Sequence, residues 1–219
     1  MTARLNLVIL GKQGAGKGTQ SKRLAQTYKI PHISTGDILR AAVKAKSPLG
    51  LEVASILESG GLVSDDLVNR LVEQRFLEPD AARGGLLDGF PRTIGQAEAL
   101  ERILGHDGIK LCINLDVPVE LVTQRLSSRR VCQECGAIYS DVDVEAISGT
   151  CSVCGGDVIQ RADDRPEAIQ KRLEAYERDT EPLLKFYESR GLLESVDGSL
   201  SPDDVTRAIA QALHARGIA

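Results

Sequence analysis

The sequence predicts an α/β fold in which helices cover both faces of a parallel β-sheet. Short apolar runs rich in β-branched residues alternate along the chain with longer segments of helical periodicity. The first apolar run leads directly into a glycine-rich loop, and the loop leads into a helix. This order of strand, loop and helix is the context that a phosphate-binding loop requires. We therefore expect a sheet with an anion site where its first strand ends.

The glycine-rich loop covers residues 11–19, between a strand expected at 5–10 and a helix expected at 19–28. Its glycines allow successive backbone N–H groups to point inward. The first turn of the helix adds unpaired amides and the positive end of the helix dipole. Lys17 supplies a mobile positive charge for the outer phosphates of a nucleotide. The alternative interpretation is a glycine turn that joins strand and helix and binds nothing.

The residue after the lysine departs from the general motif. That position is normally Ser or Thr, whose hydroxyl holds Mg²⁺, but here it is Gly18, and Thr19 comes one position later. A magnesium ion must therefore be held by another group. Asp88 is our candidate, acting through bound water because Mg²⁺ gives up its hydration reluctantly. The alternative is that Asp88 only caps a helix or turn.

Asp88 ends a further apolar run that begins at residue 85. Arg92 follows shortly afterwards, held behind a proline. This order puts a carboxylate and a guanidinium at the carboxyl end of a parallel strand, where open α/β sheets bind ligands.

Residues 30–33 predict a short strand, and a capping cluster at 34–37 predicts the start of a helix that carries Arg40. The alternative for Arg40 is a solvated side chain on a capped surface helix. A second helix start is expected at 64–66, where apolar residues at helical spacing follow. Residues 34–63 are thus interpreted as small helices that end in a glycine turn and can move as a unit.

The rest of the chain continues the alternation of strands and helices. We expect a helix at 94–104 with Gln96 near its start, a strand at 110–116, a helix from Pro118 through Arg125, Arg129 and Arg130, a strand at 192–196 and a closing helix at 202–216. Cys112 lies in the strand at 110–116 and is expected to be a plain core residue, because a free cysteine packs as a small hydrophobe.

The overall composition is that of an ordinary globular protein. The chain has 219 residues, of which 42% are hydrophobic and 26% are charged, and it is long enough to bury a core. It contains no run of 18 apolar residues, and it enters a strand without a signal-like segment, so we expect no membrane span and a cytoplasmic location. The formal charge of −4 gives no general attraction to nucleic acid. Any anion site must be a local cluster of Arg and Lys.

Four of the five cysteines form two Cys-x-x-Cys pairs. The pairs enclose 15 residues, which is the spacing of a two-knuckle zinc ribbon. They are Cys132 with Cys135 and Cys151 with Cys154. Four thiolates make a closed tetrahedral shell without an open position for water, which indicates structure rather than catalysis. The alternatives are two redox-active pairs or an iron centre in the same shell of four sulfurs.

Arginines flank the cysteine module on both sides. The N-terminal group is Arg125, Arg129 and Arg130, and the C-terminal group is Arg161, Arg165 and Arg172 with Asp163 and Asp164. The two ends of the module must lie close because the sulfurs meet, so both groups can converge on the mouth of the phosphate loop. Arginine suits that task because its planar fork binds phosphoryl oxygens in pairs. The alternative is a solvated surface cluster.

These stretches together resemble the adenylate kinases, of the bacterial long-lid type with a zinc-bearing lid, over essentially the whole chain. The resemblance rests on residues 11–19, 34–40, 87–92 with Gln96, Arg125 and Arg129, and 161–172. It implies a P-loop kinase core with a five-stranded parallel sheet, formed by residues 1–33, 64–127 and 166–219. It also implies a small helical domain for the nucleoside monophosphate at 34–63 and a zinc-ribbon-like lid at about 128–165.

The implied reaction is reversible transfer of a phosphoryl group from MgATP to AMP, giving two ADP without a covalent intermediate. This reaction serves adenine nucleotide homeostasis. The implied protein is a cytoplasmic monomer that binds ATP, AMP and ADP, with Mg²⁺ and structural Zn²⁺ as its metals and without nucleic acid or membrane as a partner.

The resemblance also implies roles for individual residues. The ATP site would comprise Gly14, Ala15, Gly16, Lys17, Gly18, Thr19, Arg125, Arg129, Ile138, Tyr139 and Leu200. The AMP site would comprise Thr35, Arg40, Gly61, Leu62, Val63, Gly89, Phe90, Pro91, Arg92, Gln96, Arg161 and Arg172. The phosphoryl transfer itself would depend on Lys17, Asp88, Arg92, Arg129, Arg161 and Arg172.

One position departs from the family pattern, because Gln13 stands where the family usually has Pro. We expect a modest effect, since the glycines and Lys17 remain. A second hypothesis is a kinase for UMP, CMP or GMP. By resemblance, Thr35 and Gln96 argue against it. A nucleic-acid-binding zinc ribbon or a nucleotide-sensing switch is a third. It is disfavoured because Tyr139 is the only aromatic residue between the outer cysteines and the charges there are acidic.

Overall fold

The computed structural model describes residues 4–218, and the centre of the fold is a five-stranded sheet in the order β2-β3-β1-β4-β8. Its strands are β1 (Leu5–Leu10), β2 (His32–Ser34), β3 (Gly84–Asp88), β4 (Leu111–Asp116) and β8 (Leu193–Asp197). Every neighbouring pair is parallel. The predicted parallel sheet is therefore confirmed, and its first three expected strands end within a residue or two of the predicted positions.

The alternating side chains of β1 divide the core into two layers. Leu7 and Ile9 belong to a buried cluster on one face of the sheet, whereas Val8 and Leu10 belong to a second cluster on the other face. This division follows from the period of two in a strand, which sends successive side chains to opposite faces. Cys112 is fully buried in the second cluster, as predicted.

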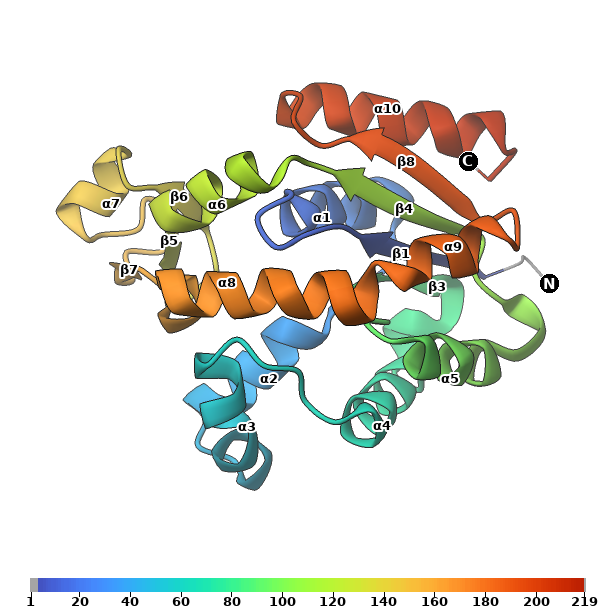
Figure 1. Cartoon of the computed structure of the whole chain (residues 1–219), viewed down its shortest axis with the longest axis horizontal. Coiled ribbons are helices and arrows are strands. Elements are labelled where there is room, and N and C mark those ends of the chain that lie inside the picture. The colour runs from blue at the N-terminus through green and yellow to red at the C-terminus, as the bar shows by residue number, and fades with distance from the viewer. Residues whose placement is uncertain (1–3, 219) are drawn as a thin grey trace.

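The helices surround the sheet as Figure 1 shows. They are α1 (Lys17–Tyr28), α4 (Asp65–Phe76), α5 (Ile94–Leu104), α6 (Val119–Ser128), α8 (Pro166–Ala175), α9 (Pro182–Glu188) and α10 (Pro202–Ala215). A π-helical turn at Tyr176–Thr180 joins α8 to α9, and short 3₁₀ turns occupy Pro79–Arg83, Gly105–Asp107 and Ala162–Asp164. Within residues 4–218, none of the helices is long and apolar enough to cross a membrane.

Two helices project from the sheet and form the α2–α3 arm, α2 (Thr35–Lys44) and α3 (Pro48–Glu58). The predicted start at 34–37 is confirmed, because the Ser34 hydroxyl caps α2 by accepting a hydrogen bond from the Asp37 amide. Ser47 caps α3 in the same way. The two helices pack closely at Gly50, where a Cβ atom would lie 2.1 Å from the Ala42 carbonyl oxygen.

The cysteines lie in a separate four-cysteine module, residues 129–159, built on a three-stranded antiparallel sheet. It consists of β5 (Arg129–Cys132), β6 (Ile138–Ser140), α7 (Val144–Ser148) and β7 (Val158–Ile159). One sequence expectation is wrong here. The helix that begins after Pro118 ends at Ser128, and Arg129 and Arg130 lie in β5 instead, where they pair with β6.

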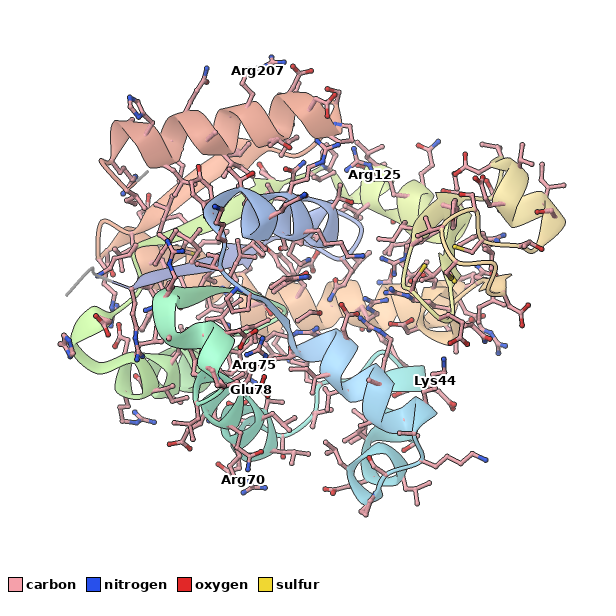
Figure 2. All side chains as sticks on the ribbon, turned by 180° about the vertical axis from the view of Figure 1, so that it is seen from behind. Lys44, Arg70, Arg75, Glu78, Arg125 and Arg207 are labelled. Carbon is pink, nitrogen blue, oxygen red and sulfur yellow. The ribbon has the colours of Figure 1, made fainter. Side chains whose placement is uncertain are left out.

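The four-cysteine module and the α2–α3 arm lie at the same end of the molecule, and α8 runs from the module back along the core (Figure 1). Lys44, at the last turn of α2, points towards the module (Figure 2), and its ammonium lies 2.8 Å from the Glu134 carboxylate. Lys22 of α1 reaches the same part of the module, because its ammonium lies 3.4 Å from the Gly136 carbonyl oxygen. Both the arm and the core thus contact the first cysteine knuckle.

Candidate active site

A cleft of about 1260 Å³ lies where β1 and β3 end, bounded by the α2–α3 arm and the four-cysteine module. Residues from the glycine loop line its floor, including Gly14, Ala15, Gly16, Lys17, Gly18 and Thr19. Ile138, Tyr139 and Leu200, which were assigned to the ATP side on resemblance, line it as well. The cleft is therefore at the carboxyl edge of the sheet, as expected for an open parallel sheet.

Close packing around the glycine loop explains why two of its positions are glycine. Gly11 has φ +135°, and a Cβ atom there would lie 2.6 Å from the Leu115 carbonyl oxygen. Gly14 has φ +83°, and its Cβ would lie 2.9 Å from the Val122 carbonyl oxygen. A side chain at either position would force the loop away from the sheet. The loop is thereby held against β4 and α6, and α1 begins at Lys17 directly behind it.

The Lys17 ammonium folds back over the loop and donates to the carbonyl oxygens of Gly11 and Lys12, at 2.6 Å and 2.9 Å. Burial lowers the pKa of Lys17 to about 8, and the nearby Asp88 carboxylate opposes this shift. A buried cation of lowered pKa gains from an incoming anion, since phosphate oxygens replace the lost hydration.

Asp88 ends β3 and lines the cleft. Its Oδ2 atom lies 3.2 Å from His32 Nε2, and a Cβ atom at Gly18 would lie 3.8 Å from the same oxygen. The carboxylate therefore stands beside the position that the general motif gives to a metal-binding hydroxyl.

Arginines from several elements reach this one cleft. Six line it, Arg40, Arg92, Arg125, Arg129, Arg161 and Arg172. Burial lowers the pKa of Arg92 and of Arg161 to about 10 in each case, with a further lowering from neighbouring guanidinium groups. Arg125 is positioned by the Gly198 carbonyl oxygen, which accepts a hydrogen bond at 3.0 Å. So many desolvated cations around one cavity indicate a polyanionic ligand.

Two members of the predicted arginine clusters do not join the cleft lining. Arg130 donates to the carbonyl oxygens of Ser127 and Arg129 instead. Arg165 occupies the N-cap position of α8, makes no side-chain capping hydrogen bond there and does not line the cavity. The convergence predicted from the cysteine spacing therefore holds for Arg125, Arg129, Arg161 and Arg172 only.

Asp164 organises two of these arginines, and sequence reasoning missed this role. Its carboxylate is fully buried and accepts hydrogen bonds from both Nε and Nη2 of Arg129. Arg172 Nη1 lies 3.2 Å from the same carboxylate. Arg129 opens β5 and Asp164 ends the 3₁₀ turn before α8, so this pair joins the two connections between the module and the core. The only sequence signal was an Asp pair next to Arg161.

Several residues assigned to the AMP side lie behind the cleft wall rather than on it. The Thr35 hydroxyl donates to the Gly89 carbonyl oxygen at 2.9 Å, and Gln96 Oε1 accepts from the Arg92 amide at 2.8 Å. Both side chains are almost fully buried. They brace the loop from Gly89 to Arg92, whose members Gly89, Pro91 and Arg92 line the cavity.

The remaining AMP-side assignments also lie outside the lining. Phe90 is fully buried in the core. Gly61, Leu62 and Val63 form the connection between α3 and α4.

Gln13 does line the cleft, and its Oε1 atom is buried without a hydrogen-bond partner among residues 4–218.

The four cysteine sulfurs of the module form one cluster, all within 4.8 Å of one another. Cys132 and Cys154 Sγ are 3.5 Å apart, and Cys135 and Cys151 Sγ are 3.6 Å apart. A tetrahedral zinc ion with Zn–S bonds of about 2.3 Å would separate its sulfurs by about 3.8 Å. The cluster can therefore hold a metal ion of that kind.

A tyrosine completes the surroundings of this cluster. The Tyr139 hydroxyl lies 3.1 Å from Cys151 Sγ, and this hydrogen bond is the largest of the contacts that lower the pKa of the Cys151 thiol, whereas contacts with the other three sulfurs raise the pKa of Cys154. A lowered thiol pKa favours the thiolate, which is the form that binds a metal.

Comparisons with known proteins agree with this geometry. The adenylate kinase family model matches residues 9–192. The chain belongs to the adenylate kinase family. Adenylate kinase of Carboxydothermus hydrogenoformans is 46% identical over 212 residues, which cover 95% of this chain and 99% of the relative. Adenylate kinase of Kosmotoga olearia is 47% identical over 208 residues, covering 94% and 97% of the two chains.

Membership of the adenylate kinase family makes the chain a nucleoside monophosphate kinase, a phosphotransferase with an α/β core. The resemblance drawn from the phosphate loop and the arginine motifs is thus confirmed at the level of family, fold and enzyme class. The alternative hypothesis of a nucleic-acid-binding zinc ribbon does not match this family.

Proposed function

We propose that this protein catalyses reversible transfer of the terminal phosphoryl group of MgATP to AMP, giving two ADP. The observation that carries the proposal is the convergence of Lys17 and six arginines on one cleft at the end of the phosphate loop. Phosphoryl transfer through a loose transition state needs in-line positioning and charge stabilisation rather than a protein nucleophile. This reaction balances the adenine nucleotides of the cell.

ATP would occupy the side of the cleft next to the glycine loop. The amides of residues 14–19 and the Lys17 ammonium would bind its phosphates, because they present donors and a positive helix end. Arg125 and Arg129 would close from the other side, with Ile138 and Tyr139 of β6 and Leu200 forming the wall near the base.

AMP would occupy the side next to the α2–α3 arm. Arg40 and Arg92 would bind its phosphate, with Arg161 and Arg172 at the point of transfer. Thr35 and Gln96 would act through the loop that they brace, since their hydrogen bonds fix Gly89 and Arg92. Phe90 and the segment from Gly61 to Val63 would complete the base pocket when the arm closes.

Asp88 would hold Mg²⁺ through bound water. Its carboxylate beside Gly18 supports this role, because oxygen ligands and retained waters are typical of magnesium sites. Bound Mg²⁺ would neutralise the charge that develops on the phosphate oxygens during transfer. His32 would orient the carboxylate through its contact of 3.2 Å.

The four cysteines would hold a structural Zn²⁺ ion. Their sulfur separations and the closed shell of four thiolates support zinc in a stabilising role. A module with so small a core gains much of its folding free energy from the metal.

We further propose that the molecule works in three parts as a cytoplasmic monomer. Residues 1–33, 64–127 and 166–219 would form the core, 34–63 the domain for AMP and 128–165 the lid. Closure of the two smaller parts would exclude water, which competes with AMP as phosphoryl acceptor. The acidic net charge gives no general attraction to nucleic acid, so the local arginine cluster of the cleft would bind the nucleotides.

The direct test is the stoichiometry of the reaction with MgATP and AMP. We expect two ADP for each AMP consumed, and loss of turnover when Mg²⁺ is chelated. Lys17→Ala should keep the fold and lower the rate by orders of magnitude, because charge stabilisation in the transition state is removed. Lys12→Ala is the matched control, since this neighbouring lysine lies outside the cleft lining and contacts the Val117 carbonyl oxygen. A Lys17→Ala enzyme with near-normal turnover would refute the assigned role.

A further inference from the structure

Tyr139 belongs both to the surroundings of the cysteine cluster and to the lining of the cleft, which also includes Cys132 and Cys135. Its hydroxyl contacts Cys151 Sγ at 3.1 Å and Ser152 Oγ at 3.2 Å. The same residue lines the cleft. One residue of β6 thus touches a candidate metal ligand through its hydroxyl and also forms part of the wall around the nucleotide site.

The contact joins the two halves of the cysteine module. Tyr139 packs against the small apolar cluster of Cys132, Cys151 and Val158, and β6 pairs with β5, which ends at Cys132. Cys151 belongs to the second knuckle. The hydrogen bond therefore fixes the second knuckle to the strand that adjoins the first.

The chemistry of a shell of four thiolates favours such a donor. Four thiolates around Zn²⁺ leave a net charge of about −2, and hydrogen-bond donors that surround the sulfurs spread this charge. Cys151 also accepts from the Val153 amide, at the longer distance of 3.4 Å. Tyr139 supplies a side-chain donor that a single substitution can remove without moving the backbone.

We propose that Tyr139 is a positioning residue that couples the metal centre to the nucleotide cleft. Its hydroxyl holds Cys151 on the metal, and its ring is held in place when the cleft is filled. The inference rests on the zinc and nucleotide assignments of the proposed function. Because coupling between two sites is reciprocal, bound nucleotide should slow the release of zinc.

The test measures zinc transfer from the full-length, zinc-loaded protein to an excess of 4-(2-pyridylazo)resorcinol, with and without saturating MgATP. MgATP should slow transfer from the wild-type protein. Tyr139→Phe, which keeps the ring and removes the hydroxyl, should release zinc about tenfold faster, the lower end of the range for loss of such a contact. MgATP should no longer slow that release.

Ser152→Ala is the matched control. It removes the other partner of the Tyr139 hydroxyl and leaves the contact with Cys151 intact. Its zinc release and its protection by MgATP should equal those of the wild type. In the cobalt-substituted proteins, the thiolate-to-cobalt charge-transfer bands should shift for Tyr139→Phe but not for Ser152→Ala, a signature that loss of packing alone does not give.

Two results would overturn the coupling. One is a wild-type release rate for Tyr139→Phe, and the other is faster release with undiminished protection by MgATP. A wild-type protein that retains no zinc would also overturn it, whereas ADP formation from MgATP and AMP by the same sample would leave the proposed reaction standing.

Discussion

Lys17 should set the alkaline limit of activity in the free enzyme. Burial lowers its pKa from 10.5 to about 8, and the protonated form is the one that stabilises phosphoryl charge. We therefore expect kcat/KM for MgATP to fall as the pH rises through about 8. Lys17→Arg, whose guanidinium stays charged, should lose this decline although its overall rate is lower. A wild-type profile that stays flat well above pH 8 would contradict the assignment.

The same ionisation has the opposite effect on stability. The pKa of a lysine in the unfolded chain is near 10.5, whereas that of buried Lys17 is about 8. Between these values the unfolded chain binds more protons, so the contribution of Lys17 to the free energy of unfolding increases with pH. Below pH 8, where Lys17 is charged in the folded protein, its burial therefore lowers the free energy of unfolding.

Asp164 should matter more for stability than its neighbour Asp163. Asp164→Ala leaves Arg129 and Arg172 without their buried counter-ion, and the loss of one partner from such a network costs about 3–5 kcal/mol. Asp163→Ala is the control, because Asp163 is partly exposed and its carboxylate pairs, among residues 4–218, with Arg172 alone. Urea unfolding of both variants measures the difference. Equal loss of stability in the two would show that Asp164 has no special structural role.

At the residue scale, placement in the cleft was predictable where a motif carried it. The glycines and Lys17 could be assigned from spacing, because the backbone geometry of the loop admits few other residues. The pairing of Asp164 with Arg129 joins residues 35 positions apart and depends on how the module folds back. Thr35 and Gln96 brace Gly89 and Arg92. The hydrogen bond from Thr35 to Gly89 likewise joins residues far apart in the sequence, and no local pattern predicts it.

At the scale of elements, the four-cysteine module should depend on its metal more than the core does. Cys151→Ser removes one of the clustered sulfurs. We expect a lower melting temperature for the module, with much of the activity retained in the cold, because the metal stabilises structure rather than taking part in the reaction. Wild-type protein stripped by a chelator should behave in the same way. Absence of bound zinc from the wild type would remove the basis of this prediction.

The four-cysteine module also explains why the predicted helix through Arg129 and Arg130 was wrong. Arg125 and Arg129 are spaced as on one helix face, and no Gly or Pro follows Ser128 to end the helix. The chain nevertheless turns into β5 at Arg129, since pairing with β6 and β7 replaces the helical hydrogen bonds. Tertiary pairing overrode local propensity there. Elsewhere strong signals sufficed, as at Ser34, whose hydroxyl caps α2.

At the scale of the whole molecule, the arm and the module approach each other across the cleft. Lys44 and Glu134 form an exposed ion pair of 2.8 Å between them, and Lys22 reaches the same knuckle from the core. Exposed pairs of this kind contribute little free energy. The contact between the arm and the module can therefore be broken at little cost in free energy.

We expect opening of the lid to limit turnover. If it does, kcat for the wild type should fall as solvent viscosity is raised with sucrose, because large segments move through the solvent. Lys17→Ala is the control, since its slow chemical step should make kcat independent of viscosity. A wild-type kcat insensitive to viscosity would exclude opening as the slow step.

The two-layered core was predictable at this scale because alternating strands and helices constrain a parallel sheet strongly. The cleft was predictable in position, since open α/β sheets bind ligands at their carboxyl edge. Its detailed lining was not, because the cavity is shaped by the α2–α3 arm and the four-cysteine module together.

The measurement that tests the central claim most directly is ADP formation from MgATP with AMP, GMP, CMP and UMP offered separately as acceptors. We predict a strong preference for AMP, since we propose that the loop braced by Thr35 and Gln96 forms the acceptor side of the cleft. Preference for another monophosphate would leave the kinase core standing and contradict the acceptor assignment. Activity with none of the four would contradict the proposed reaction itself.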